Sequence, residues 1–231
     1  MTNRTSVDIR DGVAWITMDD GKVNAMSVEM MHDIGKALDA AEEAGAVTVL
    51  TGREGIFSAG FDLNTFKRGR DAGVQMVLAG ARLIERLLSF PYPVVARCTG
   101  HAYPMGAFLM LCADVRFAIA GPWRIGMNEV AIGLTVPQFA LELARHRLTP
   151  PGFARITTAS MFGPEEALRL GYVDHVADAA DLAPTVREEA SRLRQLDMQS
   201  YAATKARINE RALVAIRAAV DAEVDRGAVG R

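Results

Sequence analysis

The 231-residue sequence lacks the marks of several large protein classes. Only two cysteines occur, Cys98 and Cys112, and both lie inside apolar runs, so we expect buried, reduced thiols and no disulfide framework. No Gly-x-Gly-x-x-Gly or P-loop motif is present, and no Gly-x-Ser-x-Gly elbow surrounds Ser58. The longest apolar run, around residues 105–113, is too short to cross a membrane.

Neither charge nor the N-terminal segment points to a special partner or compartment. The net charge is −2, so nothing indicates a nucleic-acid partner. Residues 1–11 are polar and contain no apolar segment of the secretory type, so we expect a cytoplasmic protein with no membrane partner. Half of the residues are apolar and 23% are charged, as in ordinary soluble globular proteins. A chain of this length folds as one domain, or as one domain with a small tail.

The apolar pattern predicts alternating strands and helices. Asp11-Gly12 lies between two alternating segments and predicts a β-hairpin, and Ser27 is suited to cap the helix that Gly45 ends. The expected strands are residues 6–10, 13–18, 46–51, 94–98, 114–120 and 173–176, and residues 123–127 form a further short, strand-like segment. The further expected helices are residues 74–88, 106–112, 138–147, 164–170 and 181–226.

Two loops of one kind follow two of these strands. Residues 51–63 hold three glycines and an Ala-Gly pair, and residues 99–106 lead into an apolar helix. Glycine lets a ligand approach the backbone closely, and a helix N-terminus presents free N–H groups that favour anionic oxygen. Two converging N–H donors would form an oxyanion hole.

With these loops and a third block, the sequence resembles the crotonase family, the enoyl-CoA hydratases and isomerases. The resemblance rests on residues 57–63, 100–114 and 127–133 and extends from about Val13 to about Val176. It implies an α/β fold, a crotonase-like spiral of ββα turns with a helical C-terminal region. It also implies that residues 1–180 form the spiral core, that residues 181–231 serve trimerisation, and that the protein is a homotrimer or a dimer of trimers.

The family match assigns the chemistry to named residues. The substrate would be an acyl-CoA thioester, with CoA as part of the substrate and with neither a separate cofactor nor a metal. The backbone N–H groups of Ala59 and Met105 would stabilise the thioester enolate, and Glu129 would be the base. We expect burial to raise the pKa of Glu129 toward a useful range. The residues expected to bind the substrate or its CoA part are Lys22, Val23, Ala25, Ala59, Gly60, Phe61, Asp62, Leu63 and Phe108.

Departures from the hydratase pattern favour one reaction. Hydratases of the family carry a second glutamate where this chain has Phe108, and a glycine-rich turn where it has residues 134–137. Both features resemble the mitochondrial-type Δ3,Δ2-enoyl-CoA isomerases, in which a single glutamate shuttles one proton. Asp62 and Asp114 are interpreted as structural residues, although Asp62 falls in the segment that contacts CoA in relatives.

Alternatives remain at this stage. The chain could be a hydratase, or catalyse another crotonase reaction, if a second acid comes from elsewhere. It could also be a non-catalytic acyl-CoA-binding relative, in which Met105 and Phe108 line a lipid pocket. The basic segment at residues 64–73 is either a solvated face or a contact for the phosphates of CoA.

Overall fold

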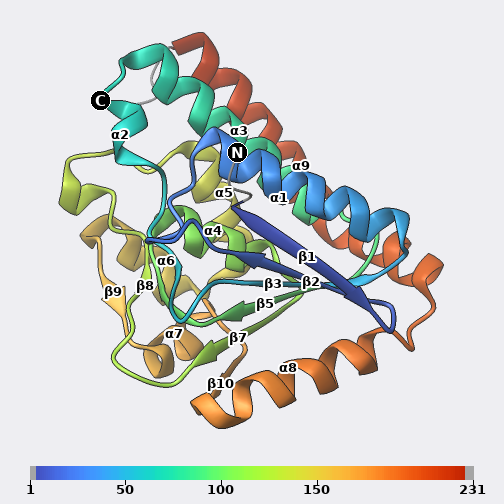
Figure 1. Ribbon diagram of the computed structural model, residues 1–231. Helices are drawn as coiled ribbons and strands as arrows, with labels where there is room; N and C mark the ends of the chain where they lie inside the picture. Colours follow the sequence, from blue (N-terminus) through green and yellow to red (C-terminus); the bar gives the residue numbers. More distant parts are fainter. Residues whose placement is uncertain (1–3, 227–231) are drawn as a thin grey trace.

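The computed structural model describes residues 4–226, with side chains described as far as residue 222, and in this part the strands form two sheets (Figure 1). The six-stranded sheet has the order β1-β2-β3-β5-β7-β10, with β1 (Thr5–Arg10), β2 (Val13–Met18), β3 (Val47–Thr51), β5 (Val94–Cys98), β7 (Val115–Ile119) and β10 (His175–Ala177). The four-stranded sheet has the order β4-β6-β8-β9, with β4 (Gly55–Ser58), β6 (Gly100–Ala102), β8 (Ile125–Gly126) and β9 (Met161–Phe162).

The predicted hairpin at the N-terminus is confirmed. β1 and β2 pair antiparallel with Arg10 opposite Val13, so two residues form the turn. Both have positive φ, 50° at Asp11 and 71° at Gly12, as a type I′ hairpin turn requires. All other neighbours in the six-stranded sheet pair parallel.

A repeated unit connects the two sheets. Each of β3, β5 and β7 is followed by a strand of the smaller sheet, β4, β6 and β8, and then by helices. These helices are α2 (Leu63–Phe66), α3 (Arg70–Leu88), α4 (Pro104–Cys112), the 3-10 turn η1 (Val130–Ile132) and α5 (Gln138–Arg147). The repetition is the predicted ββα spiral, which is confirmed. The two loops were wrongly expected to lack strands, because β4 and β6 are too short and too glycine-rich to show a strand period.

The six-stranded sheet separates two apolar layers. One face packs on α1 (Val28–Glu43) and α4, and α3 and α5 extend the same apolar cluster behind them. All nine residues of α4 are buried, as expected for a helix that is apolar on every side. The other face carries Val49, Val95 and Phe117 and packs on α8 (Ala179–Leu193).

The C-terminal region also packs on its own chain. A single helical segment over residues 181–226 was expected, but the chain forms α8 and then α9 (Met198–Arg226), with residues 194–197 between them. Leu213 and Ile216 of α9 are buried in the same cluster as α3 and α5. Figure 1 shows α9, in red, alongside α3. The domain boundary near residue 180 and the role in trimerisation stay predictions.

The remaining elements complete the second sheet and its cover. They are α6 (Pro150–Ala154), the 3-10 turn η2 (Arg155–Thr158) and α7 (Pro164–Leu170). Pro150 and Pro164 each occupy the first turn of a helix, where the missing N–H is not needed. Among residues 4–226 no helix combines the length and the apolar character that a membrane span requires.

Candidate active site

Three parallel strands bring the three sequence blocks to one edge. β4 pairs with β6 and β6 pairs with β8, both in parallel. Their carboxyl ends therefore lie side by side, and each continues into one block, residues 59–62, 103–105 or 127–129. Ligands in open α/β sheets bind at such carboxyl ends. The topology thus gathers residues that are 70 positions apart in the chain.

The loop after β4 is held by the segment that precedes α1. The Asn24 amide donates to the carbonyl oxygens of Met18 and Phe57, at 2.9 and 3.1 Å. The Ser58 hydroxyl donates to the Asn24 carbonyl at 2.8 Å and accepts from the Gly60 N–H at 3.1 Å. Asn24 is fully buried, so these bonds have little competition from water. The backbone at residues 58–60 therefore has a fixed course.

The backbone path at residues 58–60 shows that one of the two predicted oxyanion-hole donors, Ala59, must be replaced. The N–H of Ala59 donates to the carbonyl oxygen of Val23 at 2.9 Å, so it is already used inside the protein and the assignment of Ala59 to the oxyanion hole is wrong. Met26 forms a parallel bridge with Phe61, in which Met26 N–H donates to Gly60 O and Asp62 N–H to Met26 O. In such a bridge the N–H of the central residue points away from the partner strand. Phe61 N–H has no acceptor within the described structure.

The predicted donor in the second loop keeps a free N–H. Pro104 is the first residue of α4 and has no N–H, so Met105 carries the first donor of the helix. The first bond of the helix comes from Ala107 N–H to Tyr103 O. An ideal Cβ built on Gly60 would lie 3.7 Å from Met105 N, so the two loops are in close contact. The geometry therefore supports Phe61 and Met105 as a pair of donors.

Glu129 is a buried carboxylate without a partner. Its residue is 5% exposed, and neither carboxylate oxygen has a hydrogen-bond partner within the described structure. Burial raises the pKa of the Glu129 carboxyl to about 7, and the nearby N–H of its own backbone, which is not placed for a hydrogen bond, opposes the rise only in part. The predicted direction of the shift is confirmed. Its apolar neighbours Val130 and Ile132 are about half exposed, so the burial comes from elsewhere in the fold.

We expect the pH dependence of proton abstraction to report this carboxyl. Only ionised Glu129 can take a proton, so kcat/KM should rise with pH and level off above a midpoint near 7. The measurement is kcat/KM for a 3-enoyl-CoA between pH 5 and pH 9, roughly two units on each side of that midpoint. A midpoint near the ordinary value of 4.5 would contradict a buried base.

The sequence did not point to Tyr172, which lies near Glu129. Its residue is 1% exposed, its ring packs on Phe162 at a centroid distance of 5.7 Å, and β9, which contains Phe162, pairs with β8 just before Glu129. Burial, and then the charge of Glu129, raise the pKa of the Tyr172 phenol. In the sequence, a tyrosine beside a glycine in an apolar stretch indicates core packing. Only the tertiary structure could therefore reveal that Tyr172 lies near Glu129.

The predicted substrate-binding residues divide into three groups by their exposure. Lys22, Val23 and Leu63 are exposed at the surface, whereas Gly60 and Phe108 are buried. The remaining members, Ala25, Ala59, Phe61 and Asp62, are half-buried. The Asp62 carboxylate accepts from Asn64 N–H and from the Thr65 hydroxyl, so it caps α2 as the structural interpretation expects. No residue here is shown to contact CoA, and these assignments stay predictions.

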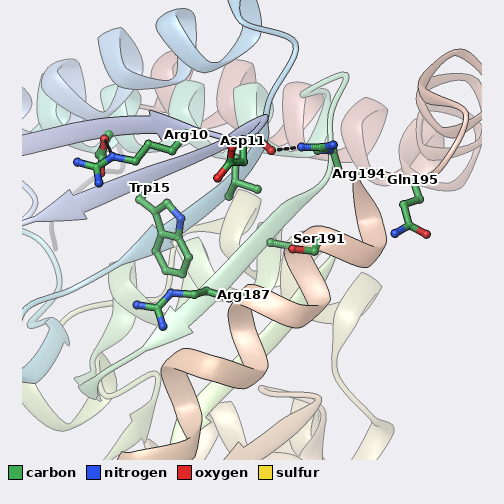
Figure 2. Close-up of a pocket in the computed structure, with 10 residues that line it drawn as sticks. Arg10, Asp11, Trp15, Arg187, Ser191, Arg194 and Gln195 are labelled. Carbon is green, nitrogen blue, oxygen red and sulfur yellow. Dashed lines mark hydrogen bonds and ion pairs between the residues drawn. The ribbon is translucent and has the colours of Figure 1, made fainter.

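A cavity of about 510 Å³ lies on the opposite face of the six-stranded sheet, between the β1–β2 hairpin and α8 (Figure 2). Trp15 and Arg187 face each other there, with the guanidinium 5.9 Å from the ring centroid. The carboxylates of Asp8 and Asp11 offset part of the positive charge of the arginines that line this cavity. None of the predicted site residues lines it. No group of three or more His, Cys, Asp or Glu side chains in the described residues could hold a metal ion.

Comparison with known proteins identifies the family. The model of the enoyl-CoA hydratase/isomerase family matches residues 8–226. The chain belongs to this family. A solved structure of a family protein from Pseudomonas syringae is 38% identical, with a TM-score of 0.94 over 95% of this chain and 96% of that chain. A Mycobacterium tuberculosis structure described as an enoyl-CoA isomerase is 39% identical, with a TM-score of 0.93 over 97% and 99%.

Family members with different activities share this similarity. A Bacillus subtilis protein described as a probable enoyl-CoA hydratase is 29% identical over 207 residues, which cover 87% of this chain and 80% of the relative. Membership of the family is therefore established, whereas the names of its members do not decide between isomerisation and hydration. That choice depends on the residues of the site.

Proposed function

We propose that the protein is a Δ3,Δ2-enoyl-CoA isomerase that uses Glu129 alone to move the proton. Its substrate is an acyl-CoA thioester, and CoA enters as part of the substrate. One observation carries the proposal: Glu129 is the only buried Asp or Glu among the side chains described, residues 4–222. Phe108, at the position of the second glutamate of hydratases, is fully buried in α4 and offers no proton.

The proposed reaction is one proton moved by one base. Glu129 takes a proton from C2 of a 3-enoyl-CoA, and the electron pair delocalises into a dienolate. The negative charge collects on the thioester oxygen, which accepts hydrogen bonds from the N–H groups of Phe61 and Met105. Glu129 then returns the proton to C4, which gives the 2-enoyl-CoA. A carboxyl with a pKa of about 7 suits both steps, because it can gain and lose a proton near neutral pH.

Hydration is the second candidate, supported by the name of the Bacillus subtilis relative. Adding water across the double bond uses a second acid or base. Tyr172 is the other titratable group affected by Glu129, so it is the group to examine if water addition occurs. A non-catalytic acyl-CoA-binding role is the third, and it offers no reason for an unpartnered buried carboxylate, which costs stability.

Product analysis separates these candidates. We expect a 3-enoyl-CoA to be converted to the 2-enoyl thioester, and a 2-enoyl-CoA to gain little water, with a rate ratio of at least about 100 because general acid–base catalysis contributes that much. Chromatography of both incubations checks this. Rapid hydration that is lost in Tyr172→Phe would replace the proposal with a hydratase. Binding of both thioesters without either product would favour the non-catalytic role.

A further inference from the structure

Gly80 in α3 makes room for two side chains of the site. An ideal Cβ at residue 80 would lie 2.7 Å from Cζ and 2.8 Å from Cε1 of Phe61, and 3.4 Å from Cε of Met105. Two of these distances are shorter than carbon atoms tolerate, so any larger residue here must displace the Phe61 ring. Phe61 and Met105 are also the residues whose backbone N–H groups are free. The side chains of both donors thus meet at one glycine.

The Phe61 ring has little freedom to move aside. The ring packs edge-on against Phe66, at a centroid distance of 6.5 Å and an interplanar angle of 83°. Phe66 in turn lies over Gly73, where an ideal Cβ would be 2.9 Å from Cδ1. Gly73 and Gly80 are seven residues apart and so share one face of α3. The two rings therefore occupy adjoining places on the same helix face.

One of the two hydrogen bonds that hold the backbone around Phe61 is long, so a displaced ring could shift this backbone. Met26 N–H donates to Gly60 O at 2.8 Å, but Asp62 N–H reaches Met26 O only at 3.4 Å. A push on the ring away from α3 would most easily lengthen the second bond, since a hydrogen bond near 3.5 Å contributes little. The N–H of Phe61 lies between these two bonds and would turn with the backbone.

We propose that Gly80 is a positioning residue that sets the separation and direction of the Phe61 and Met105 N–H groups. The inference rests on the proposed function, in which both groups bind the enolate oxygen. Such donors act only within about 2.7–3.1 Å of the oxygen, and a displacement of about 1 Å can lower a rate about 100-fold. The missing side chain at residue 80 therefore helps to set the catalytic geometry, because the side chains of Phe61 and Met105 occupy its place. Gly80 itself touches no reacting atom.

Gly80→Ala tests this, with Gly73→Ala as the matched control. Both substitutions place one methyl group on the same helix face against one phenylalanine ring, and both replace a glycine of α3 by alanine, which favours a helix by up to about 1 kcal/mol. Only Phe61 carries an oxyanion donor. We expect Gly80→Ala to lower kcat between about 10-fold and 100-fold with KM changed less than about 3-fold, and Gly73→Ala to stay near wild type.

A spectroscopic signature and a rescue complete the experiment. Polarisation of the thioester carbonyl by the two donors shifts the ultraviolet absorption of a bound 2,4-dienoyl-CoA, and this shift should shrink in Gly80→Ala. Adding Phe61→Leu removes the ring atoms that would clash and should restore most of kcat and of the shift. Equal losses in both glycine variants, no loss in Gly80→Ala, or no rescue would overturn the inference. Wild type that shows neither turnover nor a shift would instead overturn the proposed function.

Discussion

Glu129→Gln is expected to lower isomerase activity about 10²- to 10⁴-fold, the range that a positioned general base contributes. The amide has nearly the same shape as the carboxyl, so substrate affinity should change little. The measurement is kcat and KM for a 3-enoyl-CoA, together with exchange of the C2 proton with deuterated water. Near-full activity in this variant would show that Glu129 is not the base. Glu188→Gln, on the exposed surface of α8, is the matched control and should behave as wild type.

The same substitution should change how stability depends on pH. Burial raises the pKa of Glu129 from 4.5 to about 7, so between these values the folded protein keeps a proton that the unfolded chain has released. The folded state binds more protons in this window, and stability therefore falls as pH rises through it. At about 1.4 kcal/mol for each pKa unit, the loss is about 3 kcal/mol and is complete above pH 7.

Urea unfolding at several pH values checks this contribution. The difference in unfolding free energy between wild type and Glu129→Gln should shift by about 3 kcal/mol in favour of the variant between pH 4.5 and pH 7.5. A difference that does not vary with pH would mean that the carboxyl is solvated in the folded protein. Selection for packing alone would favour an apolar residue at this buried position. A carboxyl that lowers stability near neutral pH is therefore what a catalytic role predicts.

The sequence was most informative where chemistry is carried by residue type. Glu129 could be predicted as the base from the resemblance of residues 127–133 to the family, and its raised pKa from the mostly apolar stretch in which it lies. Two apolar residues of this stretch, Val130 and Ile132, are about half exposed, so they do not account for the burial of Glu129. Two of the three strands that lead into the site, β4 and β6, could not be predicted, because they are too short and too glycine-rich to show a strand period.

The sequence was least informative where function depends on backbone direction. Whether Ala59 or Phe61 offers its N–H depends on the bridge between Met26 and Phe61, a contact over 35 positions that no local pattern encodes. The two residues flank one glycine, and only the tertiary hydrogen bonds of Val23 and Met26 show which N–H is taken. The proximity of Tyr172 to Glu129 is hidden for the same reason, because it arises from the pairing of β8 with β9.

A cluster around Asp114 joins the C-terminal helix to the sheet. One carboxylate oxygen of Asp114 accepts from Val94 N–H at 2.7 Å, from the Tyr201 hydroxyl at 2.7 Å and from Lys205 Nζ at 2.8 Å. The Lys205 side chain is only 5% exposed and that of Asp114 is 22% exposed. Burial lowers the pKa of Lys205, and the charge of Asp114 opposes this. Asp114 is therefore the carboxylate that favours the charged form of this buried lysine.

Asp114→Asn is expected to lower the free energy of unfolding by about 3 kcal/mol, at the low end of the cost of breaking a buried ion pair because Asp114 is partly exposed. The amide oxygen can still accept from Val94 N–H and from the Tyr201 hydroxyl, so the loss reports the unpaired charge of Lys205. Urea unfolding at one fixed protein concentration measures it, since association with other subunits would also contribute to stability. Breaking the exposed pair of Arg217 and Glu85, which also joins α9 to α3, by Glu85→Gln should cost less than about 1 kcal/mol.

A second substitution distinguishes the charge from the packing of the helix. Adding Lys205→Met to Asp114→Asn removes the unpaired ammonium group and keeps an unbranched, mostly apolar side chain at residue 205. Most of the lost stability should therefore return. If the double variant stays as unstable as Asp114→Asn, the cluster acts through the lost carboxylate contacts and not through the buried cation. If Asp114→Asn costs less than about 1 kcal/mol, Lys205 must release its proton or reach water, and its link to the sheet would be weak. In that case α9 would depend on buried residues such as Ile216 to stay attached to the core.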